Sequence, residues 1–293
     1  MRTVADLRTP LEPRFSQTDL KVVGAMLSHQ GLVRSGNEDF ILYHLPEPGE
    51  MSRRHGALAL VADGMGGHAA GEIASEIAAR TVHLLFYQND GPVFEALDAG
   101  FRAANRIIRD QSQTDPECAG MGTTCTVIAI RHNKLWLAHV GDSRAYMMRC
   151  GTLHQLSDDQ TLVARMIREG LMTPDEAAAS PERGVILSAL GIRDVADTQI
   201  WQEGQVLVEG DVLLLCSDGL HDLVDDAYIS HTLSTQAPID ACHTLIKAAL
   251  AGGGHDNVSV GVFRIQSDRK EEGTAVDRDT REIDLTALAG GTA

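Results

Sequence analysis

Short apolar runs bounded by turn residues fill both halves of the chain and are typical of β-strands. Between them, segments 72–88 and 94–108 repeat their apolar residues at helical spacing, which predicts two helices with one buried stripe each. A third helix is expected at 239–250, where the glycines at 252–254 end it. The expected strands lie at 24–28, 40–44, 57–62, 124–130, 135–140, 144–149, 206–208, 211–217 and 257–265.

The order of these elements predicts the fold class. Strands, then helices, then strands again imply an α+β fold, and the sequential hairpins favour an antiparallel sheet. Residues 157–193 form a helical insertion, in which Thr173 to Glu176 carry a capping box with a proline at the first helical position. The organisation expected is a loose arm (1–20), one domain (21–265) and a disordered acidic tail (266–293).

Composition narrows the classes of partner. The 293 residues carry 25 Lys plus Arg against 41 Asp plus Glu, a formal net charge of −16, which argues against binding to nucleic acid or to anionic lipids. Five cysteines without a CxxC pair argue against a disulfide scaffold or a structural zinc site. With no apolar stretch near the roughly 18 residues of a membrane span and no secretory signal, we expect a cytoplasmic protein.

Acidic residues recur where strands end. Asp63, Asp142 and Asp218 each follow an apolar strand, and Asp256 precedes the last one. Antiparallel partners could bring these carboxylates together. Two like charges 4 Å apart repel by about 4 kcal/mol at an effective dielectric near 20, so such a cluster calls for a counter-charge. Two further acids, Glu38 and Asp39, open another strand.

Divalent cations would supply that counter-charge. Ligands that are all oxygen suit Mg²⁺ or Mn²⁺, and two such ions about 4 Å apart can hold a hydroxide in line with a phosphoryl group. The pattern therefore favours phosphate-ester hydrolysis. A plainer interpretation stays open, in which Asp63-Gly64 and Asp218-Gly219 are hairpin turns and Glu38 solvates a loop.

Six motifs, read together, resemble the protein phosphatase 2C family of metal-dependent serine/threonine phosphatases in its bacterial form. They are SHQGLVRSGNEDF (28–40), LVADGMGGHAAGE (60–72), GMGTTCTVIAI (120–130), HVGDSRAY (139–146), LLCSDGLHD (214–222) and GGGHDNVSV (252–260). They follow the family's order across residues 24–265. The resemblance implies a four-layer αββα sandwich, two antiparallel sheets flanked by helices on both sides, with 157–193 as the flap beside the active site.

The resemblance also implies roles for individual residues. Asp63 would bridge two catalytic Mn²⁺ or Mg²⁺ ions, and Arg34 would grip the phosphoryl oxygens with its planar donor fork. A weaker third ion is implied as well. The other residues assigned to the metal site are Gly64 through its carbonyl, Glu38 mostly through water, Asp39 as the acid that orients the ligands, Asp218 and Asp256 on the first ion, and Asp142 and Asp222 on the third.

In the family's mechanism, a hydroxide shared by the metals attacks phosphorus in line and no phospho-enzyme forms. This chain departs from the eukaryotic pattern at Met65, where a histidine acid would stand. The nearby His68 is expected to shape the glycine-rich loop. Gln160 and Ser180 replace residues often found as histidine in the flap region, and His255 stands beside Asp256, where it would perturb that ligand or face solvent.

Three functions are compatible with these sequence features. The leading one is hydrolysis of phosphoserine and phosphothreonine in proteins, on substrates of a cognate serine/threonine kinase, by a monomer that needs neither nucleic acid nor membrane. The alternative is a pseudophosphatase or phospho-binding regulatory module on the same fold, which a lost ligand would favour. An unrelated acidic cation-binding protein is the third, but the chain carries no EF-hand loop to support it.

Overall fold

Two antiparallel sheets lie face to face in the computed structural model, which describes residues 20–45, 54–66 and 69–267. The first sheet has the order β1-β12-β11-β7-β8 and the second the order β10-β6-β5-β3-β2, with β9 on β6 and β4 on β3. Their bounds are β1 Leu20–His29, β2 Asp39–His44, β3 Ala57–Met65, β4 Gly122–Thr123, β5 Cys125–Arg131, β6 Lys134–Val140, β7 Arg144–Arg149, β8 Thr152–Gln155, β9 Gln199–Ile200, β10 Gln205–Val206, β11 Val212–Cys216 and β12 Val258–Ser267.

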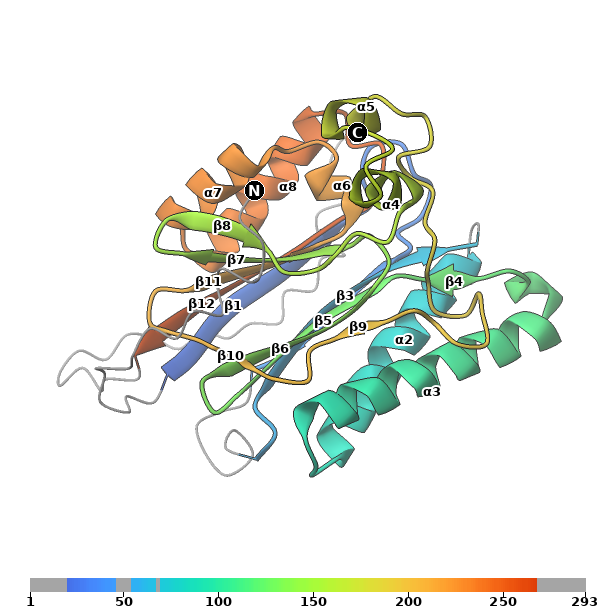
Figure 1. The fold of residues 1–293 in the computed structure, drawn as a ribbon, viewed down its shortest axis with the longest axis horizontal. Coiled ribbons are helices and arrows are strands. Elements are labelled where there is room, and N and C mark those ends of the chain that lie inside the picture. Colours follow the sequence, from blue (N-terminus) through green and yellow to red (C-terminus); the bar gives the residue numbers. More distant parts are fainter. Residues whose placement is uncertain (1–19, 46–53, 67–68, 268–293) are drawn as a thin grey trace, which may run out of the picture.

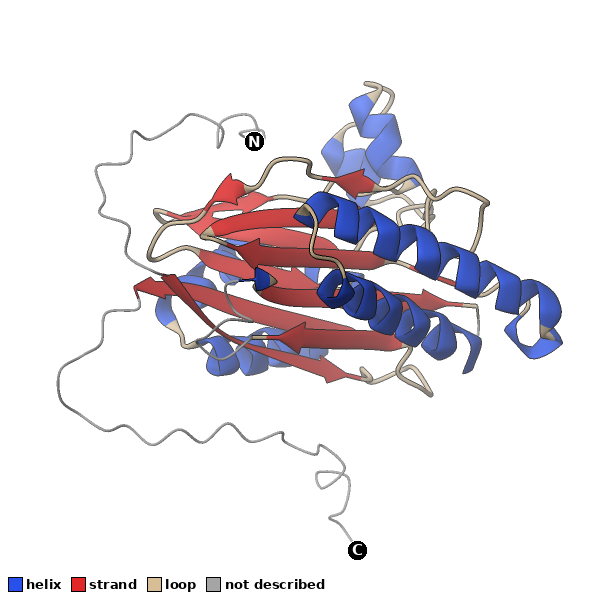
Figure 2. Ribbon diagram, turned by 90° about the horizontal axis from the view of Figure 1, so that it is seen from below, coloured by secondary structure: helices blue, strands red, loops and turns tan. Residues whose placement is uncertain are grey.

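Helices cover the outer face of each sheet, which confirms the four-layer αββα architecture (Figure 1). The long helices α2 (Ala69–Gln88) and α3 (Val93–Thr114) cross the second sheet, as Figure 2 shows from below. The first sheet is covered by α7 (Asp226–Thr235) and α8 (Pro238–Ala251). A short 3₁₀ helix, η2 (Pro116–Cys118), follows α3.

Three apolar clusters fill the three spaces between the layers. Strand β3 is buried on both faces, between the other sheet and α2, which explains its continuous apolar run. Each fully buried Leu or Phe side chain contributes about 1.5–3 kcal/mol relative to exposure. Representative members are Leu60 and Phe101 under α2 and α3, Leu214 and Leu245 under α7 and α8, and Ile128 and Phe263 between the sheets.

The structure extends several predicted strands and adds short elements that the pattern did not predict. Strand β1 begins at Leu20 and so takes in the last residue of the predicted arm, because it pairs along its whole length with β12. The two-residue strand β9 pairs with β6, and so does β10, which meets the strand predicted at 206–208 only at Val206. Such segments are too short to show a hydrophobic period, and their pairing comes from tertiary contacts. Residues 1–19 and 268–293, predicted as arm and tail, lie outside the described residues.

The predicted insertion runs between β8 and β9 and carries two short helices, α4 (Leu162–Arg168) and α5 (Pro174–Ala178). The expected capping box is present: the Thr173 hydroxyl accepts a hydrogen bond from the Glu176 backbone, and the Glu176 carboxylate accepts one from the Thr173 backbone. Figure 1 shows α4 and α5 at one end of the sandwich, next to the one-turn helix α6 (Asp218–His221). We call residues 157–193 the flap.

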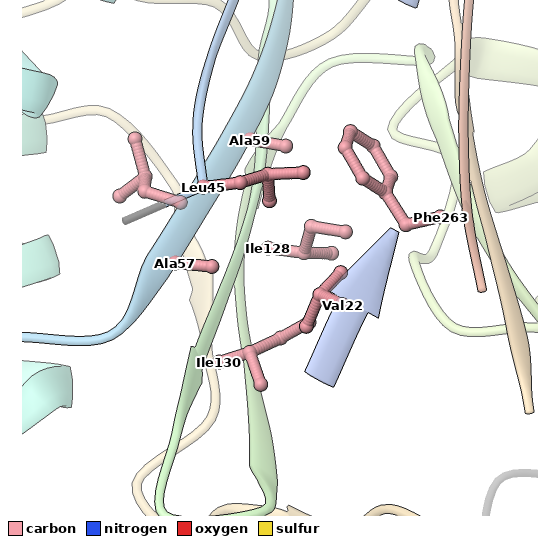
Figure 3. Close-up of a pocket in the computed structure, with 8 residues that line it drawn as sticks. Val22, Leu45, Ala57, Ala59, Ile128, Ile130 and Phe263 are labelled. Atoms are coloured by element: carbon pink, nitrogen blue, oxygen red, sulfur yellow. The ribbon is translucent and has the colours of Figure 1, made fainter. Parts of the chain in front are cut away.

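A small apolar cavity lies between the two sheets, where Val22, Ile128 and Phe263 approach one another (Figure 3). Its volume of about 10 Å³ is room for one water molecule at most, and its lining offers that water almost no polar partner. The cavity is therefore a packing gap in the core. Among the described helices, none has the length and apolar character needed to cross a bilayer.

Candidate metal centre

The register of the second sheet places two acids side by side. Asp39, the first residue of β2, lies directly opposite Asp63 of β3. The backbone of Asp63 is fixed on its other side, because its N–H donates to the Thr124 hydroxyl at 2.9 Å and its carbonyl accepts from the Thr124 N–H at 2.9 Å. The Ser217 hydroxyl, at the end of β11, donates to Asp39 Oδ2 at 2.8 Å. A residue at the end of a first-sheet strand, Ser217, therefore fixes the carboxylate of Asp39 in the second sheet.

Two more acids reach this pair from the first sheet. Asp218 follows β11 and begins α6, and its charge is one of those that raise the pKa of Asp63. Asp142 lies in the turn between β6 and β7 and is only 5% exposed. The ends of four strands thus bring Asp39, Asp63, Asp142 and Asp218 together, as the sequence predicts.

Asp256 approaches from the loop before β12 and is paired with Arg34. The Arg34 Nη2 donates to Asp256 Oδ2 at 2.7 Å, while the Asn257 N–H donates to Asp256 Oδ1 at 2.8 Å. Both side chains are partly open to solvent. The negative charges of Asp256, Glu38 and Asp63 raise the pKa of Arg34, so the guanidinium is held next to the acids in its charged form.

Glu38 and Gly64 meet beside α2. A Cβ atom on Gly64 would lie 2.8 Å from the Glu38 carbonyl oxygen and 2.0 Å from that of Gly71, so only glycine fits there. Gly71 in turn leaves room for the Glu38 carboxylate, whose Oε2 would lie 2.4 Å from a Cβ atom at that position. The two glycines therefore set the position of Glu38 against the end of β3.

Without a counter-charge, ionising the acids of this cluster is energetically unfavourable, and their pKa values are raised. Burial is the largest cause that raises the pKa of Asp39 to about 7 and that of Asp218 to about 6. Burial, and then the charge of Asp39, raises the pKa of Asp63 well above its ordinary range, and burial does the same for Asp142. Such shifts mark sites where protons, or cations in their place, must neutralise the acids.

Unsatisfied oxygens test whether these residues fit a metal ion. Buried Oδ1 atoms of Asp39, Asp142 and Asp218 have no hydrogen-bond partner, an arrangement that costs free energy unless something else binds them. Within the described ranges, no group of three or more His, Cys, Asp or Glu side chains is arranged so that all of them could hold one metal ion. Because Mg²⁺-like ions keep several waters and take few protein ligands, the oxygen-only donor set fits them. The residues present fit a hydrated Mg²⁺ or Mn²⁺ ion.

The interpretation of the two Asp-Gly pairs as hairpin turns is wrong. Asp63 and Gly64 lie inside β3, which continues to Met65 and pairs with β4 there. Asp218 and Gly219 are the first two residues of α6. A Cβ atom on Gly219 would lie 2.0 Å from the Asn257 carbonyl oxygen, so this glycine is required by the close approach of two loops.

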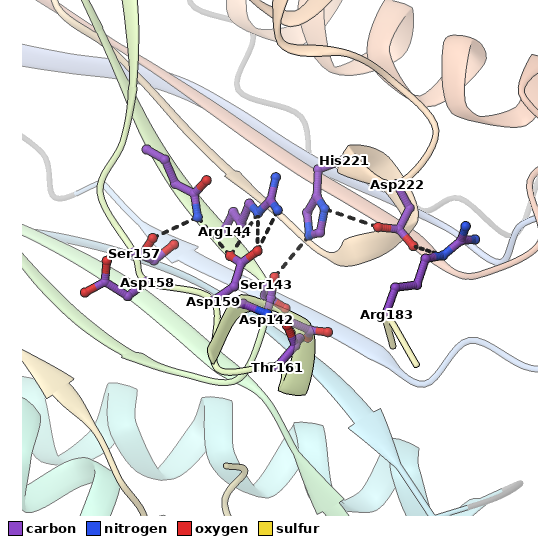
Figure 4. Close-up of polar contacts among 12 residues, drawn as sticks. Asp142, Ser143, Arg144, Ser157, Asp158, Asp159, Thr161, Arg183, His221 and Asp222 are labelled. Carbon is purple, nitrogen blue, oxygen red and sulfur yellow. Dashed lines mark hydrogen bonds and ion pairs between the residues drawn. The ribbon is translucent and has the colours of Figure 1, made fainter. Parts of the chain in front are cut away.

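A second polar network lies next to the cluster, on the flap side (Figure 4). Arg144 of β7 is paired through Nε and Nη2 with Asp159, at 2.5 Å for the shortest contact, and both are mostly buried. His221 Nε2 lies 3.0 Å from the Asp142 carbonyl oxygen. Arg183 of the flap approaches Asp222 Oδ2 at 3.7 Å. Asp222 is thus the most exposed acid of this group and the one that faces the flap.

The two buried histidines near the site, His139 and His221, are held in their neutral form at neutral pH. Burial lowers the pKa of His139 to about 4 and that of His221 to about 3. Met65 offers no proton, and His68 lies outside the described residues. His255 is exposed and its ring lies over Gly253, so it faces solvent.

Two residues of the site were not assigned from sequence. Asn257 donates from Nδ2 to the carbonyls of Gln30 and Gly36 and accepts from the Glu38 N–H, so it fixes the loop that carries Arg34. Its place directly after Asp256 was the available signal. Gln160 accepts from the Gly141 N–H at 2.9 Å and so ties the base of the flap to the turn that holds Asp142.

Comparisons with known proteins agree with this geometry. The family model "Protein phosphatase 2C" matches residues 23–165. The chain is 42% identical over 239 residues to the serine/threonine protein phosphatase PstP of Mycobacterium tuberculosis, matching 81% of this chain but only 44% of that protein, so it spans less than half the length of that relative. It is 32% identical to the protein phosphatase PhpP of Streptococcus pneumoniae, with 84% of this chain and 99% of that protein matched. The catalytic domain of PstP, solved in complex with two manganese ions, superposes with a TM-score of 0.73 at 38% identity over 85% of this chain and 100% of that one.

Proposed function

This chain belongs to the protein phosphatase 2C family, and on that premise we propose that it is a metal-dependent protein serine/threonine phosphatase. The observation that carries the proposal is the cluster of buried carboxylates with unsatisfied oxygens beside the charged Arg34. Residues 21–265 would carry the activity, with the flap at its border. Its substrates would be phosphoserine and phosphothreonine proteins, the products of a serine/threonine kinase, and it would work as a monomer. A cytoplasmic location stays a prediction from composition.

We infer the ligand roles from the positions of these residues. Asp63, at the centre of the acids, would contribute to two Mn²⁺ or Mg²⁺ ions, with Asp218 and Asp256 on one of them. The Gly64 carbonyl and Glu38 would serve the same centre from the α2 side, and Asp39, held by Ser217, would orient Asp63 across the strand pair. Asp142 and Asp222, on the flap side, would hold a weaker third ion.

When bound, such cations supply a water-derived nucleophile at neutral pH and stabilise negative charge on the phosphoryl oxygens. The chain's own part is to position the substrate. Arg34 presents a planar donor fork at the edge of the acid cluster, which suits two phosphoryl oxygens at once. Its neighbours Asp256 and Asn257 hold it there. Because no described residue offers an acid in place of Met65, the leaving serine or threonine oxygen would take its proton from water in the site.

Hydrolysis assays test this proposal. The purified protein should hydrolyse p-nitrophenyl phosphate and a phosphothreonine peptide with Mn²⁺, and should lose this activity in EDTA. Asp63→Asn should reduce turnover by about 100-fold or more, since it removes a charge from the centre of the site. Glu203→Gln, in an exposed loop, is the matched control and should keep full activity.

An inactive wild-type protein, or an Asp63→Asn variant with full activity, would contradict the proposal. A protein that binds the phosphopeptide with Mn²⁺ but never hydrolyses it would instead support the phospho-binding module.

A further inference from the structure

Two large apolar side chains stand exposed beside Arg34. Leu32 is 64% exposed and Val33 is 69% exposed, although both lie in the loop that joins β1 to β2 at the candidate site. Isolated exposed apolar residues are ordinary on protein surfaces. These two are adjacent in sequence to each other and to the one arginine that we assign to the phosphoryl group, which makes their exposure informative.

The loop holds these side chains in a fixed position. Leu32 donates its N–H to the Gly254 carbonyl at 2.7 Å, and the Gln30 side chain donates to the Arg34 carbonyl at 2.7 Å. Gly31 has a φ of +83° and packs so closely on Asp256 that a Cβ atom would lie 2.2 Å from its carbonyl oxygen. A surface held in this way loses little conformational entropy when a ligand covers it.

Gly254 is buried beneath this loop and brings two leucines together. A Cβ atom at this position would lie 3.0 Å from Leu32 Cγ and 3.0 Å from Leu250 Cδ2, so the two leucines are neighbours above a residue that has no side chain. Leu250 closes α8. We call Val33, Leu32 and Leu250 the apolar rim: Leu32 and Leu250 are neighbours over Gly254, and Val33 lies between Leu32 and Arg34 in the chain.

We propose that the apolar rim binds an apolar side chain of the substrate, one or two residues away from the phosphorylated serine or threonine. This inference rests on the proposed function, because it takes Arg34 as the residue that marks the phosphoryl position. Consecutive Cα atoms are 3.8 Å apart, so the Cα atoms of Val33 and Leu32 lie within two residue spacings of that of Arg34. An extended substrate peptide spans the same distance between the phosphorylated residue and a side chain one or two positions away. Substrates would thus be selected by an aliphatic neighbour of the phosphorylated residue.

Peptide kinetics test the inference. A set of phosphothreonine peptides places a single leucine in turn at each of the four positions within two residues of the phosphothreonine, with serine elsewhere. With Mn²⁺, wild-type protein should show kcat/KM about 5- to 10-fold higher for at least one leucine peptide than for the all-serine peptide, mainly through a lower KM. In Val33→Ser and in Leu32→Ser this ratio should fall to about 2 or less.

Val206→Ser is the matched control, since Val206 is 54% exposed but pairs with Lys134, at the end of β6 remote from Asp142. It should keep the wild-type ratio. A wild-type protein that cleaves p-nitrophenyl phosphate but does not distinguish the peptides would overturn the apolar rim and leave the proposed function standing. A preference that survives both rim variants would also overturn it, and a protein that hydrolyses nothing would overturn both proposals.

Discussion

Substitution of Asp39 measures how much a buried, ionised acid lowers the free energy of unfolding of the metal-free protein. The side chain is 8% exposed, it faces Asp63, and one of its oxygens has no partner. Asp39→Asn keeps the shape and removes the charge. We expect the variant to be more stable than the wild type in EDTA at pH 8 and to keep only about a third of that gain at pH 5.

The magnitude follows from the pKa of Asp39. Burial raises it from an ordinary value of about 3.9 to about 7, a difference that corresponds to about 4 kcal/mol. The folded protein binds this proton more tightly than the unfolded chain, so the contribution of Asp39 to stability is full below about pH 4 and is lost as the pH rises through about 7. Because Asp63 titrates with it, the gain of the variant at pH 8 should be at most about 4 kcal/mol.

The buried histidines His139 and His221 change the stability with pH in the opposite direction to Asp39. Their contribution must therefore be separated from that of Asp39. The lowered pKa values of His139 and His221 mean that the unfolded chain takes up their protons first as the pH falls, which destabilises the fold below about pH 6.5. This effect is common to the wild type and the variant. The difference between their free energies of unfolding therefore isolates Asp39.

The assay is urea unfolding at pH 5, 6, 7 and 8 in EDTA, repeated with Mn²⁺. The stability gain of Asp39→Asn should grow across this range in EDTA and should shrink or reverse with Mn²⁺, because the ion then favours the charged acid. Glu203→Gln, an exposed control, should give a difference that does not vary with pH. A gain that is equal at pH 5 and pH 8 would refute the reasoning.

Three further predictions concern neighbouring charges. Arg34→Ala should bind Mn²⁺ several-fold more tightly in calorimetry, since the cation then meets Asp256 without a competing positive charge, and weaker binding would contradict that competition. Asp159→Asn should lower the free energy of unfolding by about 3–5 kcal/mol in urea titrations, because it leaves the buried Arg144 without its partner charge, whereas a loss below about 1 kcal/mol would show that solvent compensates. Asp142→Asn should slow turnover while two Mn²⁺ ions still bind in calorimetry, and loss of those two ions would refute a separate third site.

Hydrophobic periodicity predicted the long helices and strands of this fold, and the resemblance to the phosphatase family implied its four layers. The stripe of α3 is confirmed by Leu97, Phe101 and Ile108, all buried, because a helix with one apolar face repeats its signal over several turns. Strand β9 and helix α7 were not predicted, and strand β10 overlaps the strand predicted at 206–208 only at Val206. The two short strands are defined by their partners, and α7 carries only a weak periodic signal, so single-chain periodicity could not show them.

The candidate site was predicted in its members but not in its arrangement. That acids end several strands is visible in the sequence, yet the pairing of Asp39 with Asp63 depends on the register between β2 and β3. The partners that hold the acids, Ser217 and Asn257, come from distant segments and have side chains that are common in loops. Their roles follow from three-dimensional contacts that a linear pattern does not contain.

Asn257 and Asp256 join the loop that carries Arg34 to a segment more than 220 residues later in the chain. During synthesis, the ribosome releases β1 and Arg34 early, whereas β12 and these two residues emerge among the last described residues. A nascent chain can thus form the α2–α3 layer long before it can align Arg34 or complete the acid cluster. The order of translation itself delays the functional site until the domain is whole, and incomplete chains also lack the strand that joins β1 to β11 in the first sheet.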